Sequence, residues 1–102
     1  MILYIDTTDF SKITYGLKSE KLLIKTYNVD SRASHKTLES LSKFIKFSKV
    51  PLKQISKIVV SKGPGSYTGV RVGVSHALAL SFGLDIPMQA ISQQKMQKEL
   101  KI

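Results

Sequence analysis

The sequence predicts a single α/β domain in which a mixed five-stranded sheet is combined with helices. Short apolar runs bounded by polar or turn residues predict the strands. Two longer stretches, 34–47 and 70–82, place apolar residues at helical spacing. The length of 102 residues is sufficient for one hydrophobic core but not for two lobes with a cleft between them.

The five strands are expected at 2–6, 12–17, 21–29, 55–61 and 88–91. The first ends in the polar run Asp6-Thr7-Thr8-Asp9. The second and third are expected to form an antiparallel hairpin, because only Lys18-Ser19-Glu20 separates them. The fourth and fifth each follow a helix, which predicts parallel pairing through helical crossovers.

The first helix is expected at 34–47, where the apolar residues at helical spacing are Leu38, Leu41 and Ile45, with Phe44 at the edge of the stripe. Ser34 is a candidate N-cap, and Pro51 lies just past the end. Phe47 lies nearly opposite Leu38 on this helix, at about 100° per residue. A further helix is expected to begin after Ser92, with Met96 and Leu100 one turn apart.

The second helix is expected at 70–82 and is expected to end at Gly83. One of its faces would pack on the sheet and consists of Val70, Val74, Ala77, Leu78 and Ser81. Another face is almost as free of charge and consists of Val72, His76, Ala79 and Leu80. A helix that is apolar on all sides is buried both on the side that faces the sheet and on the opposite side. The second face, together with Phe44 and Phe47 of the first helix, is therefore a candidate partner interface. The alternative is that the helix lies deep within the chain's own core.

Composition favours a cytoplasmic protein and leaves a nucleic-acid role open. The chain has no cysteine, which excludes disulfides, thiolate metal sites and a cysteine nucleophile. Its start lacks the features of a signal peptide, and no segment has the ~20 apolar residues of a membrane span. The formal net charge is +9, but 14 of the 16 cations are lysines. Such a surface either attracts RNA or is simply solvated.

The most informative motif joins the fourth strand to the second helix and contains three glycines, a proline and three hydroxyl residues. Its residues are Gly63, Pro64, Gly65, Ser66, Tyr67, Thr68, Gly69 and Arg71, with Val70 between the last two. The glycine spacing does not fit a Walker loop, a dinucleotide fingerprint or a nucleophile elbow. What remains is a helix N-terminus that could hold an anion weakly. We expect Gly65, Gly69 and Gly73 to let the second helix lie close to the sheet and to the first helix.

This segment closely resembles the V-S-x-G-P-G-S-[FY]-T-G-[LV]-R motif of the TsaB (YeaZ) family, whose members act in tRNA threonylcarbamoyladenosine biosynthesis. The opening Met1-Ile2-Leu3, His35 before the first helix, and the segment from Leu84 to Ser92 resemble the same family. The resemblance implies one lobe of the actin-like ATPase fold, also called ribonuclease-H-like. Residues 1–102 would form the N-terminal lobe only, and the second lobe of the family would be absent.

The resemblance also bears on whether this chain can form a nucleotide site. In actin-like proteins two lobes hold the nucleotide, so one lobe would keep half a site at most. Asp6, Thr7 and Thr8 lie where such proteins contact phosphate, but a turn held by their own side chains is the favoured interpretation. Ser92-Gln93-Gln94-Lys95 lacks the glutamate of the family's helix cap. No cofactor is expected.

A metal-dependent nuclease with a ribonuclease-H-like fold is the sharpest enzymatic alternative. Asp6 and Glu39 would supply two carboxylates, but Ser61 and Lys62 occupy the place of the third. His35 and His76 lack the spacing of a metal site. No catalytic residue and no metal site is therefore assigned.

The resemblance implies a non-catalytic scaffold that binds a TsaD-like subunit, in which the transfer chemistry resides. In that family these two helices pair with the related helices of TsaD or with a second TsaB copy. TsaE and tRNA would be reached through the complex, and no membrane contact is expected. The alternative is a small basic RNA-binding module that acts without TsaD.

Overall fold

A computed structural model describes residues 1–9, 11–28 and 34–101, with the side chains of 34–38 outside the description. The elements in chain order are β1 (Ile2–Asp6), β2 (Lys12–Lys18), β3 (Leu22–Asn28), α1 (Ser34–Ser48), the 3₁₀ turn η1 (Leu52–Gln54), β4 (Lys57–Ser61), α2 (Tyr67–Leu84), β5 (Met88–Ile91) and α3 (Gln93–Leu100). The candidate cap role of Ser34 and the side chains of His35 and Leu38 lie outside the described residues.

The sheet has the expected mixed arrangement. Its five strands lie in the order β3-β2-β1-β4-β5. β1 pairs antiparallel with β2, and β2 with β3, whereas β4 pairs parallel with β1 and with β5. Both parallel connections run through a helix, which confirms the prediction from the element order.

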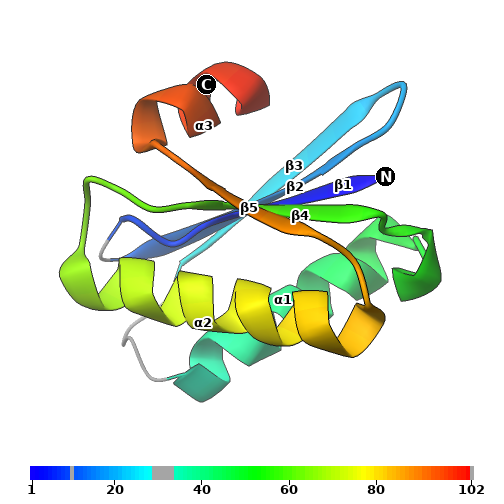
Figure 1. Ribbon diagram of the computed structural model, residues 1–102, viewed down its shortest axis with the longest axis horizontal. Helices are drawn as coiled ribbons and strands as arrows, with labels where there is room; N and C mark the ends of the chain where they lie inside the picture. Colours follow the sequence, from blue (N-terminus) through cyan, green and yellow to red (C-terminus); the bar gives the residue numbers. More distant parts are fainter. Residues whose placement is uncertain (10, 29–33, 102) are drawn as a thin grey trace.

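The sheet is covered on both faces, and alternation along the strands assigns residues to each face. α1 and α2 lie on one face and α3 on the other (Figure 1). Leu3 and Ile5 of β1 belong to the larger core, together with Ile13, Tyr15, Leu17, Leu41, Phe44, Ile55, Ile58, Val60 and Ala77. Tyr4, between them, belongs to the smaller core under α3, together with Val59, Ile91, Met96 and Leu100.

The end of α2 differs from the prediction. The helix continues through Gly83 to Leu84, and its C-cap is Asp85, whose φ is 55°. Asp tolerates the left-handed conformation better than most residues, so it can end a helix as glycine does. At the other end, the Ser66 side chain accepts a hydrogen bond from the Gly69 N–H, and the helix begins at Tyr67 rather than at residue 70.

The segment between α1 and β4 also differs from the expectation. β4 begins at Lys57, two residues later than predicted, and η1 precedes it. Ile55, expected in the strand, is instead a buried residue at the end of this short turn. Across the described ranges, no helix is long and apolar enough to span a bilayer.

Candidate functional site

The carboxyl ends of the parallel strands β1, β4 and β5 meet at one edge of the sheet, on the left of Figure 1. In α/β sheets this edge is where ligands commonly bind. The glycine-rich turn leaves β4 at this edge and enters α2, while Asp6, Thr7 and Thr8 follow β1. The two segments singled out from the sequence are therefore brought together.

The glycine turn lies directly against the end of β1. The Ser66 N–H donates to the Thr8 carbonyl oxygen at 2.7 Å, and the Thr7 hydroxyl donates to the Gly69 carbonyl oxygen at 2.5 Å. A Cβ atom added to Gly65 would overlap Thr8, and one added to Gly69 or Gly73 would overlap Thr7. The expected close approach to the sheet is confirmed, whereas the described part of α1 contributes none of the atoms nearest to these glycines.

In the remainder of the motif Gly63 is buried, whereas Pro64 and Thr68 are exposed. Gly63 has a φ of 94°, which favours glycine, and the Gly63–Pro64 peptide bond is cis. Tyr67 and Arg71 are exposed and interact with each other one helical turn apart. Arg71 Nη1 donates to the Tyr67 hydroxyl at 3.1 Å, and the guanidinium lies 5.3 Å from the centre of the tyrosine ring.

Asp6 is engaged by its own neighbours. Its Oδ1 accepts from the Thr8 N–H at 3.0 Å and from the Thr8 hydroxyl at 2.6 Å. Its Oδ2 accepts from Gln93 Nε2 at 2.8 Å. Ser61 donates to Gln93 Oε1 at 2.6 Å, so one amide joins the ends of β1 and β4. This is the geometry of a structural turn, and a phosphate-binding role for Asp6, Thr7 and Thr8 stays a prediction.

A metal pair does not fit this arrangement. Both oxygens of Asp6 already accept hydrogen bonds, and Ser61 occupies the end of β4, where a further carboxylate would be needed. In the described parts of the chain, no three His, Cys, Asp or Glu side chains gather as a metal site would require. The edge does contain an open polar pocket of about 480 Å³. Its lining includes Asp6, Asp9, Lys12, Gln93 and Gln97.

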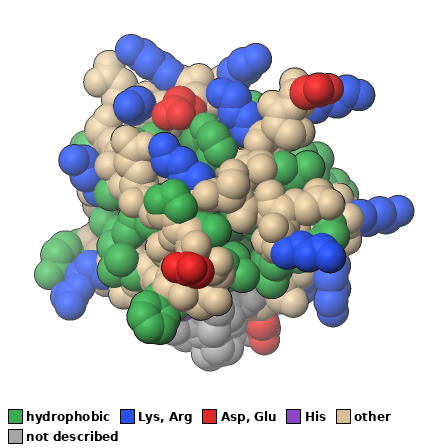
Figure 2. Space-filling model, turned by 45° about the vertical axis from the view of Figure 1, so that its right-hand side comes forward, with side chains coloured by type: hydrophobic (Ala, Val, Ile, Leu, Met, Phe, Trp, Pro, Cys, Tyr) green, Lys and Arg blue, Asp and Glu red, His purple; other side chains and the backbone are tan. Residues whose placement is uncertain are grey.

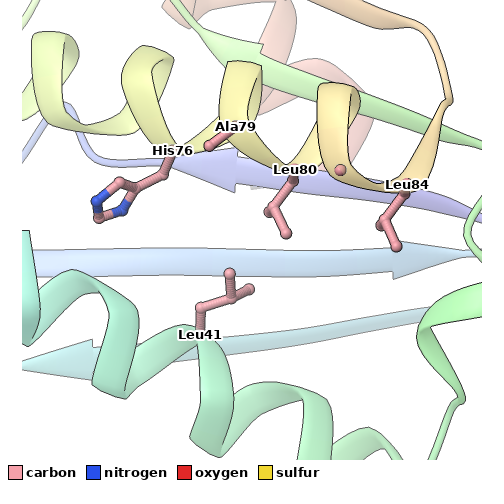
Figure 3. Close-up of a pocket in the computed structure, with 6 residues that line it drawn as sticks. Leu41, His76, Ala79, Leu80 and Leu84 are labelled. Carbon is pink, nitrogen blue, oxygen red and sulfur yellow. The ribbon is translucent and has the colours of Figure 1, made fainter.

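The second candidate site is an apolar groove between α1 and α2, shown in Figure 3. Leu41 points from α1 toward α2, and Leu80 and Leu84 point back toward α1 (Figure 3). A hollow of about 300 Å³ is lined by these three residues together with His76, Ala79 and Gly83. A second hollow of about 340 Å³ shares Leu41 and Leu80 and extends past Ile45 of α1 to Leu52 of η1. We call these two hollows the helix groove.

The outer surface next to the helix groove is also apolar. Phe82 is 90% exposed, Leu78 54% and Phe47 50%. Leu78 was expected to face the sheet and does not, because the helix places Ala77 there with no exposed surface. Phe82 was not singled out from the sequence, although it lies one turn from Leu78 and on the same side of the helix.

Phe44 is a correction to the predicted interface. Its side chain is completely buried. The ring stacks on Tyr15 with the centroids 5.4 Å apart, and Ser40, one turn earlier, exchanges a hydrogen bond with the Tyr15 hydroxyl at 2.9 Å. Phe44 therefore anchors α1 to β2 and is not available to a partner.

The other predicted interface residues are at least partly accessible. Val72, His76 and Leu80 are half-buried, and Ala79 is exposed. His76 Nδ1 is buried and has no hydrogen-bond partner among the residues that the structure describes. Burial lowers the pKa of His76 below its usual value, so the neutral imidazole is favoured. An uncharged histidine preserves the apolar character of the helix groove.

Comparison with known proteins shows which families share these features. The family model described as "TsaD: tRNA N6-adenosine threonylcarbamoyltransferase" matches residues 28–97. Among curated proteins, the tRNA threonylcarbamoyladenosine biosynthesis protein TsaB of Bacillus subtilis is 38% identical over 93 residues. That alignment covers 89% of this chain and 40% of the relative. The chain thus spans less than half the length of this curated relative.

Solved structures show the fold. YeaZ from Pseudomonas aeruginosa superimposes with a TM-score of 0.80 at 24% identity, covering 98% of this chain and 51% of YeaZ. Thermus thermophilus RuvC, solved in complex with a Holliday junction substrate, gives a TM-score of 0.63 at 10% identity, covering 95% of this chain and 67% of RuvC. These similarities confirm the predicted ribonuclease-H-like, actin-like fold class.

Proposed function

We propose that this chain, which belongs to the TsaD family of tRNA N6-adenosine threonylcarbamoyltransferases, is a scaffold subunit of tRNA threonylcarbamoyladenosine biosynthesis. The proposal is supported by the similarity of the chain, over most of its length, to the TsaB (YeaZ) relatives. In this role it would bind a TsaD-like subunit through the helix groove and perform no chemistry itself. TsaE and tRNA would be engaged through the resulting complex.

The helix groove is the observation that supports this proposal most directly. It joins two hollows that are lined mainly by apolar side chains, and Phe47, Leu78 and Phe82 extend the apolar surface beyond them. Contiguous exposed apolar surface of this kind marks an interaction site on a soluble domain. A second copy of the chain could cover the same surface when the TsaD-like subunit is missing.

The carboxyl edge supports the non-catalytic part of the proposal. A site that activates a nucleophile or a metal needs polar groups that are free to act on a substrate. Here Asp6 is used by Thr8 and Gln93, and Ser61 is used by Gln93. The side chains at this edge hold strand ends together, so chemistry is assigned to the partner subunit.

Size-exclusion chromatography with light scattering tests the proposal, using this chain alone and mixed with a TsaD protein. Ala79→Glu places a charge in the helix groove, whereas Ala90→Glu makes the same substitution on the exposed edge strand β5. We expect co-elution at a defined stoichiometry, at least tenfold weaker binding for Ala79→Glu, and binding within twofold of the original chain for Ala90→Glu. Thermal unfolding confirms that both variants are folded.

Two results would contradict the proposal. One is a folded chain that does not bind TsaD at all. The other is equal affinity in the Ala79→Glu and Ala90→Glu variants, which would place any contact outside the helix groove. Salt-sensitive tRNA binding without TsaD binding would instead favour the RNA-binding module that acts alone.

A further inference from the structure

The end of the molecule opposite the glycine turn contains a concentration of lysines that the scaffold role does not use. Five of them, Lys18, Lys21, Lys49, Lys53 and Lys57, lie in segments that meet where β1 and β4 begin. We call this surface the amino edge. It is on the right of Figure 1, where the N-terminus, the β2–β3 turn and the C-terminal end of α1 come together.

The strand register brings two of these lysines into one row. Ile2 of β1 is paired with Lys18 of β2 on one side and with Lys57 of β4 on the other. Neighbouring strands are about 4.8 Å apart, so the two lysine Cα atoms are separated by about 10 Å across β1. Side chains at one register position point to the same face of a sheet. The two ammonium groups can therefore reach one extended ligand.

The remaining three lysines are held beside this row by contacts of the segments that carry them. The N-terminal ammonium of Met1 donates to the Gln54 carbonyl oxygen at 3.0 Å, which fixes η1, and with it Lys53, next to the start of β1. Lys21 and Val50 line the same hollow, so the β2–β3 turn lies close to the chain segment that contains Lys49.

These cations are accessible. Lys18, Lys21, Lys49 and Lys53 are exposed, and Lys57 is half-buried. Carboxylates near these lysines include Glu20, in the β2–β3 turn, and Asp85, at the end of α2. Glu99 of α3 accepts a hydrogen bond from the Tyr4 hydroxyl, two residues along β1 from Ile2. Figure 2, in which the right-hand side of Figure 1 comes forward, shows Lys and Arg side chains extending outward around this face and far fewer acidic ones.

We infer that the amino edge is an RNA-binding surface that contacts the phosphate backbone. This inference rests on the proposed function, because it gives the scaffold a direct contact with the tRNA on which its complex would act. Lysines contribute point charges rather than the planar fork that reads base edges. The amino edge therefore holds RNA by its backbone, without sequence preference and with strong dependence on salt.

The shape and chemistry of the surface favour RNA over other anionic partners. An anionic membrane would be bound more strongly by a surface that also presents aromatic anchors. In the segments that form the amino edge, the large exposed apolar side chains are Leu52, at 40% exposure, and Phe47 in the last turn of α1, at 50% exposure. The Lys25 ammonium lies 5.2 Å from the centre of the Phe47 ring, so this ring is already in contact with a cation of the chain. Lysines arranged across sheet, turn and helix end match a polyanion that passes over several elements.

The test compares two variants of the whole chain that lose the same charge at different places. The amino-edge variant carries Lys18→Gln, Lys21→Gln, Lys53→Gln and Lys57→Gln. The control variant carries Lys43→Gln, Lys62→Gln, Lys95→Gln and Lys98→Gln, all at exposed positions outside the amino edge. Lys49 is retained in both, because its φ of 59° makes the helix end sensitive to substitution.

Fluorescence anisotropy with labelled tRNA is measured between 50 and 200 mM salt. The protein concentration is varied over the range of dissociation constants for non-specific binding, about 10⁻⁶ to 10⁻⁴ M. We expect the amino-edge variant to lose at least tenfold in affinity. Its slope of log K against log salt should be shallower by about 3, because each lost phosphate contact removes about 0.7 to 0.9 from the slope. The control variant should lose less than threefold.

Equal losses in the two variants would overturn the inference, since they would show a response to total charge alone. No measurable binding of tRNA by the original chain at 50 mM salt would also overturn it. Tighter binding to phosphatidylserine vesicles than to tRNA, lost in the amino-edge variant, would assign the surface to a membrane instead. Co-elution of the amino-edge variant with TsaD should be unchanged, so a failure of the helix groove is distinguished from a failure of the amino edge.

Discussion

Replacing Gly69 by alanine should destabilise the chain, whereas the same substitution at Gly83 in the same helix should stabilise it. A Cβ atom at Gly69 would overlap the carbonyl oxygen of Thr7, which is backbone and cannot move aside like the end of a flexible side chain. A Cβ atom at Gly83 would have no heavy atom outside its own helical turn and chain neighbours within 4 Å. Comparing the two variants therefore separates the effect of close packing on stability from the effect of helix propensity.

The expected magnitudes follow from three contributions. Alanine is favoured over glycine inside a helix by about 1 kcal/mol, and this gain is common to both variants. At Gly69 the overlap costs about 1–3 kcal/mol, as overpacking does elsewhere. Weakening the hydrogen bond from the Thr7 hydroxyl to the Gly69 carbonyl oxygen costs about 1 kcal/mol more. The net change is a loss of about 1–3 kcal/mol for Gly69→Ala and a gain of up to about 1 kcal/mol for Gly83→Ala.

Thermal and urea unfolding followed by circular dichroism measures both variants. For a domain of this size, 1 kcal/mol shifts Tm by about 4–8 °C, so the two variants should differ in Tm by at least about 4 °C. Gly73→Ala, where the obstacle is the Thr7 hydroxyl group rather than its carbonyl, should be intermediate or close to Gly69→Ala. A Gly69→Ala variant as stable as Gly83→Ala would refute the claim that α2 depends on close approach to Thr7.

Two further predictions concern aromatic and titratable side chains on the two long helices. Phe44→Ala should lower the free energy of unfolding by about 3–5 kcal/mol, because it removes a fully buried ring. Phe47→Ala should lower it by less than about 1 kcal/mol, because this ring is half exposed, and should weaken TsaD binding instead. Equal losses for the two variants in urea unfolding would contradict this prediction. Burial lowers the pKa of His76 in the folded state. The contribution of His76 to the free energy of unfolding should therefore be fully present above about pH 6.5 and should decrease as pH falls toward the folded-state pKa. His76→Gln should reduce that decrease, and an unchanged pH profile would disprove it.

The strands and their order could be predicted because strand formation depends on local apolar runs and short connections. The predicted bounds of β1 and β5 match the structure. β2 ends one residue later than predicted, at Lys18, and β3 begins one residue later, at Leu22, while its predicted end at residue 29 lies outside the described residues. The end of α2 could not be predicted from glycine, because Gly83 continues the helix in open space and Asp85 takes the left-handed position. A rule based on residue type cannot distinguish these two without the surrounding structure.

The candidate site was predicted in part, and the failures have a common cause. The glycine turn and the close approach of α2 to the sheet follow from residue type and position, so both could be predicted from the sequence. Phe44 and Leu78 were assigned to the wrong surfaces because a helical wheel gives the angle of a residue but not the extent of the neighbouring sheet. Tyr15 reaches Phe44, whereas no part of the sheet buries Leu78. The Asp6–Gln93–Ser61 network joins strands that are far apart in sequence, and composition gives no signal for it.

The two proposed surfaces adjoin at η1, where Leu52 lines the helix groove and Lys53 belongs to the amino edge, but they differ in their other residues. The residues that line the helix groove include Lys46 but none of the five amino-edge lysines. α1 contributes to both surfaces through different parts, because Leu41 and Ile45 face the groove and Lys49 lies past the helix end. A subunit docked in the groove would therefore leave the row formed by Lys18 and Lys57 open to RNA. Since the row lies on the β-sheet and the groove on the helices, the sheet would set the distance between a protein bound in the groove and RNA bound at the row.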